Sequence, residues 1–249
     1  MNVVIFDTET TSLDKPFCYN IGYNIVDINS HNSILQKSFV VEQVWHNKMC
    51  FVSSYYAEKR PIYIKEMRAK KTKMEKFGYI CQEMIRDFKN YNVEIAFAYN
   101  SSFDERVFNF NCDWFKCNNP FDTIEIRDIR GFVHNFIVDN DYIDFCERNE
   151  KFTESGNYST TAETVKQYIS NDISFEEEHT ALSDSIIETE ILLESLNRGA
   201  NILQNYNTKK SIQRNVPKIL KIKYNNDIIF MHDCMSYKVF RNKNMIVLK

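Results

Sequence analysis

The chain has 249 residues, of which 43% are hydrophobic and 14% aromatic, and its formal net charge is −3. This composition excludes an intrinsically disordered chain and allows one large domain, or one domain with an appendage. The apolar runs are too short to cross a bilayer, and no secretion-signal pattern opens the sequence. We therefore expect a cytoplasmic protein with no membrane partner. Few Gly and Pro with many Asn, Lys and Ile suggest an AT-rich genome, that of a phage or a low-GC bacterium.

Seven cysteines stand at irregular spacings, which is typical of reduced thiols in an intracellular protein. Cys112 and Cys117 are the closest pair, but no second pair lies near them in the sequence. That is a poor pattern for zinc, so ordinary buried or surface thiols are expected here.

The first part of the chain has the periodicity of strands followed by helices. Strands are expected at Val3–Asp7, Tyr19–Ile28 and Ser38–Glu42, and their spacing predicts an antiparallel meander. Residues 43–57 and 72–90 are expected to be helical, the second with apolar residues three and four apart on one face.

The next part alternates a strand with helices. Glu94–Ala98 is predicted to be a short buried strand, and a helix is expected from about Phe103. Two further helices are expected at 160–170 and 180–197, and Gly199 ends the last one. The order favours an α/β fold with a mixed sheet.

Three acidic motifs stand at the ends or beginnings of these elements. Asp7 and Glu9 follow the first apolar run, and alternate residues of a strand point to the same face. Asp104 follows the buried strand, and His179 stands five residues before Asp184 where a late helix begins. Each motif alone is a weak signal, but their order and contexts together indicate a carboxylate site for metal-assisted phosphodiester hydrolysis.

In that order, the three motifs resemble the DEDDh 3′→5′ exonucleases, the DnaQ-like and ribonuclease T-like family of the ribonuclease H-like superfamily. The matching segments are Phe6–Leu13, Ala98–Asp104 and His179–Asp184. The resemblance covers about residues 1–197 and implies a ribonuclease H-like mixed sheet flanked by helices. A Thr at position 180 excludes the related subtype that has a Tyr four residues before the last Asp.

The resemblance also implies roles for individual residues. Asp7 would bridge two divalent ions, Mg²⁺ or Mn²⁺, with Glu9 and Asp184 on the first ion and Asp104 on the second. His179 would be the general base that deprotonates the attacking water. Oxygen ligands are the ligands that these hard cations prefer, and an imidazole titrates near neutral pH.

Other positions of the same motifs are expected to touch substrate. Thr10, Thr11 and Leu13 match the family's loop that contacts the 3′-terminal nucleotide, and Ser12 stands where the family often has Gly. Asn100 matches a family Asn that either binds substrate or ties the end of its strand. The sequence leaves both roles open.

The predicted function is a metal-dependent 3′→5′ exonuclease that releases nucleoside 5′-monophosphates from single-stranded or frayed 3′ ends. DNA proofreading or end processing is favoured, with a DNA polymerase or another replication or repair protein as partner. The alternatives are an RNA 3′-end trimming exoribonuclease and a catalytically silent nucleic-acid-binding or scaffold protein. Ribonuclease T relatives are dimers, so the resemblance also suggests a homodimer.

The distribution of charge and the expected secondary structure divide the chain into a predicted exonuclease domain at 1–199 and a basic, β-rich extension at 200–249. From residue 201 onward there are 10 Lys and Arg against 2 Asp, a net +8, whereas the preceding residues carry 21 basic against 32 acidic groups, a net −11. Short strands are expected at Ile219–Tyr224, Ile228–His232, Tyr237–Arg241 and Met245–Leu248. The extension is expected to face nucleic acid, to dock a partner, or to cover the core.

The segment 51–76 interleaves tyrosines with basic residues. Aromatic side chains that stack on bases, beside cations that bind phosphates, are typical of single-strand binding. A lid helix whose tyrosines pack on the core is the competing interpretation.

Overall fold

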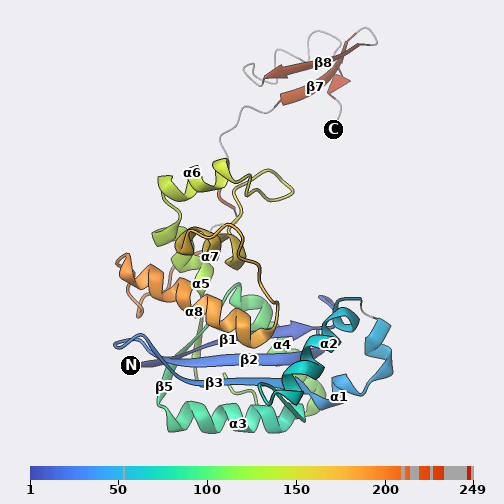
Figure 1. The fold of residues 1–249 in the computed structure, drawn as a ribbon, viewed down its shortest axis with the longest axis vertical. Coiled ribbons are helices and arrows are strands. Elements are labelled where there is room, and N and C mark those ends of the chain that lie inside the picture. The colour runs from blue at the N-terminus through green and yellow to red at the C-terminus, as the bar shows by residue number, and fades with distance from the viewer. Residues whose placement is uncertain (53, 209–210, 214–218, 225–226, 233–245, 248–249) are drawn as a thin grey trace.

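A computed structural model describes residues 1–52, 54–208, 211–213, 219–224, 227–232 and 246–247. Its centre is a six-stranded mixed sheet in the order β4-β3-β2-β1-β5-β6 (Figure 1). The three long strands form an antiparallel meander, as expected, whereas β5 runs parallel to β1, β6 to β5, and β4 to β3. The strands are β1 Asn2–Thr10, β2 Cys18–Asp27, β3 Asn32–Val41, β4 Lys73–Glu75, β5 Val93–Ala98 and β6 Glu125–Asp128.

Helices cover both faces of this sheet. In Figure 1, α3 lies below the sheet and α8 above it, while α1 and α2 stand beyond the end of β1. The helices before β6 are α1 Glu42–Trp45, the 3₁₀ helix η1 Lys48–Val52, α2 Ser54–Arg68, α3 Phe77–Asn90 and α4 Ser101–Phe115. Those after it are α5 Ile129–Phe132, the π-helix η2 Val133–Ile137, α6 Asn140–Arg148, α7 Ala162–Ser170 and α8 Ala181–Asn197.

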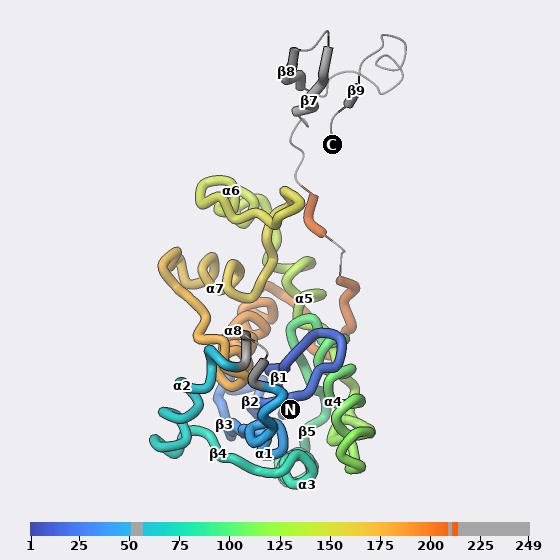
Figure 2. The backbone as a smooth tube through the Cα atoms, turned by 90° about the vertical axis from the view of Figure 1, so that its right-hand side faces the viewer, coloured from blue at the N-terminus to red at the C-terminus, as the bar shows by residue number. Residues whose placement is uncertain are grey.

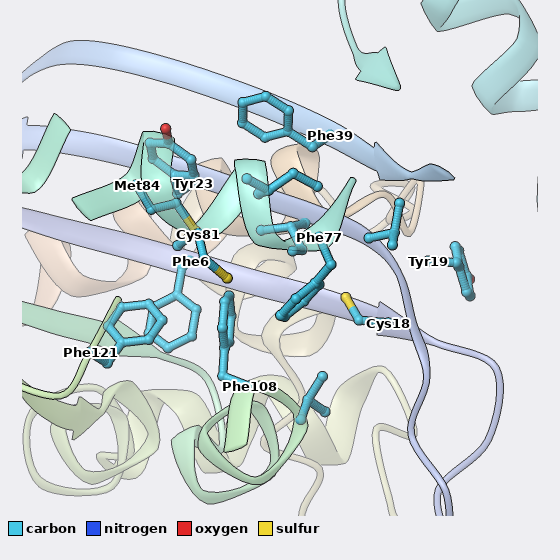
Figure 3. Close-up of a cluster of buried hydrophobic side chains, with 14 of the residues drawn as sticks. Phe6, Cys18, Tyr19, Tyr23, Phe39, Phe77, Cys81, Met84, Phe108 and Phe121 are labelled. Carbon is cyan, nitrogen blue, oxygen red and sulfur yellow. The ribbon is translucent and has the colours of Figure 1, made fainter. Parts of the chain in front are cut away.

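Alternate residues of β1 point into two separate hydrophobic cores. Val4 and Phe6 face the core that includes α3 and α4, whereas Val3 and Ile5 face the core that includes α5, η2 and α8. Phe6 stacks on Phe121, with ring centroids 4.2 Å apart (Figure 3). Because strand side chains alternate, Asp7 and Glu9 continue the Val3–Ile5 face toward α8.

Two of the expected helices differ from the structure. The predicted helix at 72–90 begins at Phe77, because Lys73–Glu75 pairs with the edge of β3 as β4. The predicted helix at 43–57 is broken into α1, η1 and the start of α2, which continues to Arg68 with Pro61 inside it. Edge pairing and helix breaks of this kind depend on tertiary contacts, which local periodicity does not encode.

The C-terminal strands are β7 Ile219–Tyr224, β8 Asp227–His232 and β9 Ile246–Val247, and both β8 and β9 pair antiparallel with β7. The expected strand at Tyr237–Arg241 lies outside the described residues. Before β7, the Tyr206 ring packs edge-on against Phe132, and Ile212 forms an isolated bridge with Tyr158. Among the described residues, no helix is both long and apolar enough to span a membrane.

Candidate active site

Three of the predicted carboxylates meet where β1 ends. Asp7 and Glu9 come from β1 and Asp184 from the first turn of α8, and one oxygen of each lies within 4.8 Å of the others. The first turn of α8 can lie against the sheet because Gly22 stands opposite Asp7 in β2. A Cβ at position 22 would be only 2.1 Å from the backbone nitrogen of Leu182. The glycine therefore sets the distance between Asp184 and the strand.

Local hydrogen bonds hold the beginning of α8 in place. Thr180 is the N-cap and forms a capping box with Ser183. The backbone N–H of Ala181 donates to Oδ1 of the buried Asn20 at 2.9 Å, and the Tyr63 hydroxyl donates to the same oxygen at 3.0 Å. Asn20 thus joins β2, α2 and α8. The sequence signal that could have identified Asn20 is its polar side chain within a mostly apolar strand.

Asp104 lies in the first turn of α4, on the other side of β1 from α8. Its side chain is only 2% exposed, and Oδ1 accepts a hydrogen bond of 2.6 Å from the Thr8 hydroxyl. Burial raises the pKa of Asp104 to about 7. Its charge in turn raises the pKa of Asp7, so the two groups share one electrostatic environment.

A fifth acidic side chain, Glu188, was missed by the sequence motifs. It lies one helical turn after Asp184, is buried, and accepts a 3.3 Å hydrogen bond from the backbone N–H of Tyr99. Two carboxylates four residues apart on a helix share one face, and that spacing was the available signal. Burial, followed by the charges of Asp104 and Asp184, raises the pKa of Glu188.

The electrostatics of the cluster favour a bound cation. Burial is the first cause of the raised pKa of Asp7, and Asp104, Glu188, Asp184 and Glu9 add to it in that order. Burial and the nearby Glu177 and Glu9 raise the pKa of Asp184 to about 8. Close, desolvated carboxylates repel one another in the absence of a counter-ion, and their hard oxygen atoms fit a divalent ion such as Mg²⁺ or Mn²⁺.

His179 lies just before α8, beside the carboxylate cluster. Its backbone is left-handed, with φ +51°, and its side chain is 55% exposed. Nδ1 is 3.5 Å from Oε2 of Glu177, and the ring groups with Glu163 and Glu177 rather than with Asp7, Glu9 and Asp184. Partial burial and then Lys59 lower the pKa of His179.

Lys59 connects α2 to the His179 segment. Its Nζ donates to the carbonyl oxygen of His179 at 2.7 Å and to that of Glu178 at 3.4 Å. Figure 2 shows the chain between α7 and α8 descending beside α2. Elsewhere in the segment 51–76, Tyr63 is fully buried, which agrees with the core-packing interpretation for that residue. The side chains of Tyr55 and Tyr56 lie outside the described residues.

A pocket of about 370 Å³ opens next to Glu9. Thr10, Thr11 and Leu13, the residues of the loop expected to contact the terminal nucleotide, line this pocket, and Leu13 is 74% exposed. Phe103 forms the other side of the pocket. Arg106, which the sequence motifs missed, lies over the Phe103 ring at 5.3 Å and donates to the carbonyl oxygen of Leu13 at 3.2 Å.

Asn100 does not line that pocket. It is the N-cap of α4 in a left-handed conformation, with φ +63°. Its backbone N–H donates to Oδ1 of Asp128 at 2.9 Å, and its side-chain oxygen accepts from Arg130 at 3.4 Å. These contacts tie the end of β5 to the end of β6, which is the structural alternative for this residue.

No protein-family model matches the sequence, and no curated protein matches it. Solved structures do match the fold. The nuclease domain of 3′hExo, a DEDDh family member bound to rAMP, has a TM-score of 0.55 at 11% identity, over 85% of this chain and 97% of that one. A 3′-exonuclease that recognises the 3′ end of a histone mRNA stem-loop has a TM-score of 0.54 at 12% identity, over 94% and 92%.

The cell-death related nuclease CRN-4 has a TM-score of 0.51 at 12% identity, over 80% of this chain and 64% of that one. At such low identity these matches establish the architecture alone. The TM-scores of 0.55, 0.54 and 0.51 show that this chain shares the overall fold of the three structures. The chain therefore has the DEDDh exonuclease fold, a ribonuclease H-like mixed sheet flanked by helices.

Proposed function

We propose that this protein is a metal-dependent 3′→5′ exonuclease that acts on single-stranded or frayed 3′ ends and releases nucleoside 5′-monophosphates. The observation that carries the proposal is the meeting of Asp7, Glu9 and Asp184 at the end of β1, next to a nucleotide-sized pocket. Acidic side chains that bind cations and a pocket that binds a chain end are the two components that such an enzyme needs.

Asp7, Glu9 and Asp184 would hold divalent ions, with Asp104 beside them. When bound, such ions supply positive charge that activates a water molecule and stabilises the departing oxygen. The exposed Leu13 would pack against the terminal base, and Thr10 and Thr11 would offer polar groups to its sugar; their place in the lining of the pocket supports these roles. Arg106 keeps the Leu13 loop against α4.

His179 is the group proposed to accept the proton of the attacking water. Its lowered pKa keeps the imidazole neutral at neutral pH, which is the form that can accept a proton. It immediately precedes Thr180, the N-cap of α8, and Asp184 lies in the first turn of the same helix. Activity is therefore expected to rise with pH as the imidazole loses its proton.

The polymer is proposed to be DNA, with an RNA 3′ end as the second candidate. The RNA candidate is supported by the likeness to a fold that, in 3′hExo, binds rAMP. Proofreading would require a polymerase partner, and a dimer remains part of the proposal. The C-terminal extension, whose net charge is +8 from residue 201 onward, would add affinity for the phosphates of either polymer.

The test uses 5′-labelled and 3′-labelled single-stranded DNA and RNA of matched sequence, with Mg²⁺, Mn²⁺ or EDTA. We expect a metal-dependent ladder that shortens from the 3′ end, and its loss in Asp7→Asn. Asp144→Asn, an exposed carboxylate on α6, is the matched control and should cut normally. No cleavage of either polymer by the wild-type protein with metal would refute the proposed activity. Internal cleavage products would refute the exonuclease mode, and shortening from the 5′ end would refute the polarity.

A further inference from the structure

Three cysteines from separate segments meet at the far end of α4 from Asp104. Cys81 is in α3, Cys112 in the last turn of α4, and Cys117 just beyond that helix. Their three sulfur atoms all lie within 4.8 Å of one another. Asp104 and Cys112 are eight residues apart on one helix, a separation of about 12 Å at the α-helical rise, so the two clusters are distinct.

The end of α4 brings two of the thiols together. Lys116 adopts a left-handed conformation with φ +56°, and the N–H of Cys117 donates to the carbonyl oxygen of Cys112 at 3.1 Å. This six-to-one hydrogen bond is that of a Schellman motif, which turns the chain back over the last helical turn. Cys112 and Cys117, which have four residues between them, thus have their sulfur atoms within 4.8 Å of each other, although this spacing is a poor zinc pattern in the sequence.

The third thiol comes from α3, which packs tightly against this turn. A Cβ at Gly78 would lie 3.5 Å from Cβ of Cys117, so the two segments are in contact one turn before Cys81. Figure 3 shows Cys81 in the core with Phe6, Phe77 and Phe108. Cys81 and Cys112 are buried, whereas Cys117 is half-buried and opens the cluster toward solvent.

Sulfur atoms at this spacing suit a thiophilic cation. A Zn–S bond of about 2.3 Å requires sulfur atoms about 3.8 Å apart in a tetrahedral site, a short adjustment from the present arrangement. Mg²⁺ and Mn²⁺ prefer oxygen ligands, so they would not compete for this cluster. A disulfide would use two of the three thiols, and all three are free thiols.

We propose that Cys81, Cys112 and Cys117 form a three-thiolate Zn²⁺ site, separate from the carboxylate site, with water as the fourth ligand on the Cys117 side. The ion would join α3 to the end of α4. Because α4 also carries Asp104, the ion would stabilise the helix that supports one predicted catalytic carboxylate. Metal binding by thiolates contributes directly to folding stability, so the zinc-loaded protein should unfold at a higher temperature.

The test is a titration of the reduced, metal-free, full-length protein with Co²⁺, which reports thiolate ligands by charge-transfer absorption in the near ultraviolet. We expect the band to saturate at one ion per chain, to disappear when Zn²⁺ is added, and to be insensitive to Mg²⁺. Cys117→Ser and Cys112→Ser should lose the band. Cys146→Ser, a buried thiol in the other core, is the matched control and should keep it, as should Asp7→Asn.

Measurements on the wild-type protein alone are enough to refute the zinc site. No charge-transfer band with Co²⁺, or zinc-edge X-ray absorption that shows only nitrogen and oxygen neighbours, would leave three unliganded core thiols. Binding of Cu⁺ without Zn²⁺ would also refute the zinc assignment. Zinc-edge data with three sulfur neighbours would support the site even if a serine variant failed to fold. None of these readouts depends on exonuclease activity.

Discussion

Glu188 adds a fifth carboxylate, itself buried, to the four that were expected in the acidic cluster. It is held by the N–H of Tyr99, and its charge is the second-largest electrostatic contribution to the raised pKa of Asp7. It therefore belongs to the electrostatics of the proposed metal site.

Glu188→Gln keeps the shape of the side chain and removes its charge. We expect the Mg²⁺ concentration for half-maximal activity to rise severalfold, because less negative charge attracts the ions, and the metal-free protein to become more stable near neutral pH. A Mg²⁺ titration of activity and a thermal melt in EDTA measure the two effects. Glu190→Gln, an exposed neighbour on α8, is the control. An unchanged Mg²⁺ requirement would restrict Glu188 to packing.

Lys59 is expected to position the segment that carries His179, the proposed general base. Lys59→Met removes the two hydrogen bonds to the carbonyl oxygens of Glu178 and His179. We expect kcat to fall roughly tenfold to a hundredfold, because a displaced base loses alignment, with a smaller change in KM. Lys59→Arg should recover part of the loss.

The pH profile separates this role from simple destabilisation. Lys59 lowers the pKa of His179, so its removal should move the acidic limb of the kcat profile to higher pH. In the wild type that limb should lie below pH 6.5, the ordinary histidine value, with activity rising as pH increases. Glu163 opposes Lys59 by raising the same pKa. A profile that keeps its midpoint in Lys59→Met would argue against the electrostatic contact.

At the scale of elements, the packing of α8 on β2 decides where Asp184 lies. Gly22→Ala would place a Cβ against the backbone of Ala181 and Leu182, at 2.2 and 2.1 Å, so the helix has to move away. We expect a loss of about 1–3 kcal/mol in the free energy of unfolding. Activity should fall more than stability predicts, roughly a hundredfold, because Asp184 moves with the helix.

Gly78→Ala is the matched control for this substitution. Its Cβ would meet only the Cys117 side chain, at an ordinary 3.5 Å, and alanine is the better helix former. Chemical denaturation and nuclease assays of both variants measure the difference. Equal behaviour of the two variants would mean that the close contact at Gly22 does not control the site.

The elements also show what the sequence could and could not predict. The apolar run of β1 and the spacing of the meander are local patterns, and they predicted the centre of the sheet. The one-sided periodicity of α3, also a local pattern, predicted that helix. β4 was missed because its three residues form a strand only by pairing with β3. Asn20, Glu188 and Cys81 were missed for the same reason: each acts through a partner that lies distant in the sequence or across a helical turn.

For the whole molecule, the acidic site imposes a dependence of stability on pH. The pKa of Asp104 is raised to about 7 and that of Asp184 to about 8, and the pKa values of Asp7 and Glu188 are raised as well. A carboxyl whose pKa is higher in the folded state favours folding when protonated. Its contribution is complete below the ordinary value of 3.8 and is lost as pH rises to about 8.

The metal-free protein should therefore melt at progressively lower temperature as pH rises through this window. Asp27 and Asp172, whose pKa values are lowered, act in the opposite direction, but their contribution is already complete above the ordinary value of 3.8. Mg²⁺ should restore stability most at the alkaline end, where the carboxylates are ionised and can bind it. The melting temperature is measured across this range in EDTA and in Mg²⁺.

The variant Asp184→Asn sharpens this test because it removes one titrating group without adding a charge. Its melting temperature in EDTA should depend less on pH than that of the wild type, and Mg²⁺ should stabilise it less. Asp144→Asn, whose carboxyl is exposed, should follow the wild type in both conditions. A wild-type melting temperature that stays level or rises across the window in EDTA would mean that the buried carboxylates are compensated within the protein. The folded protein would then not need a divalent cation to offset the charge of the acidic cluster, whatever the nuclease assay showed.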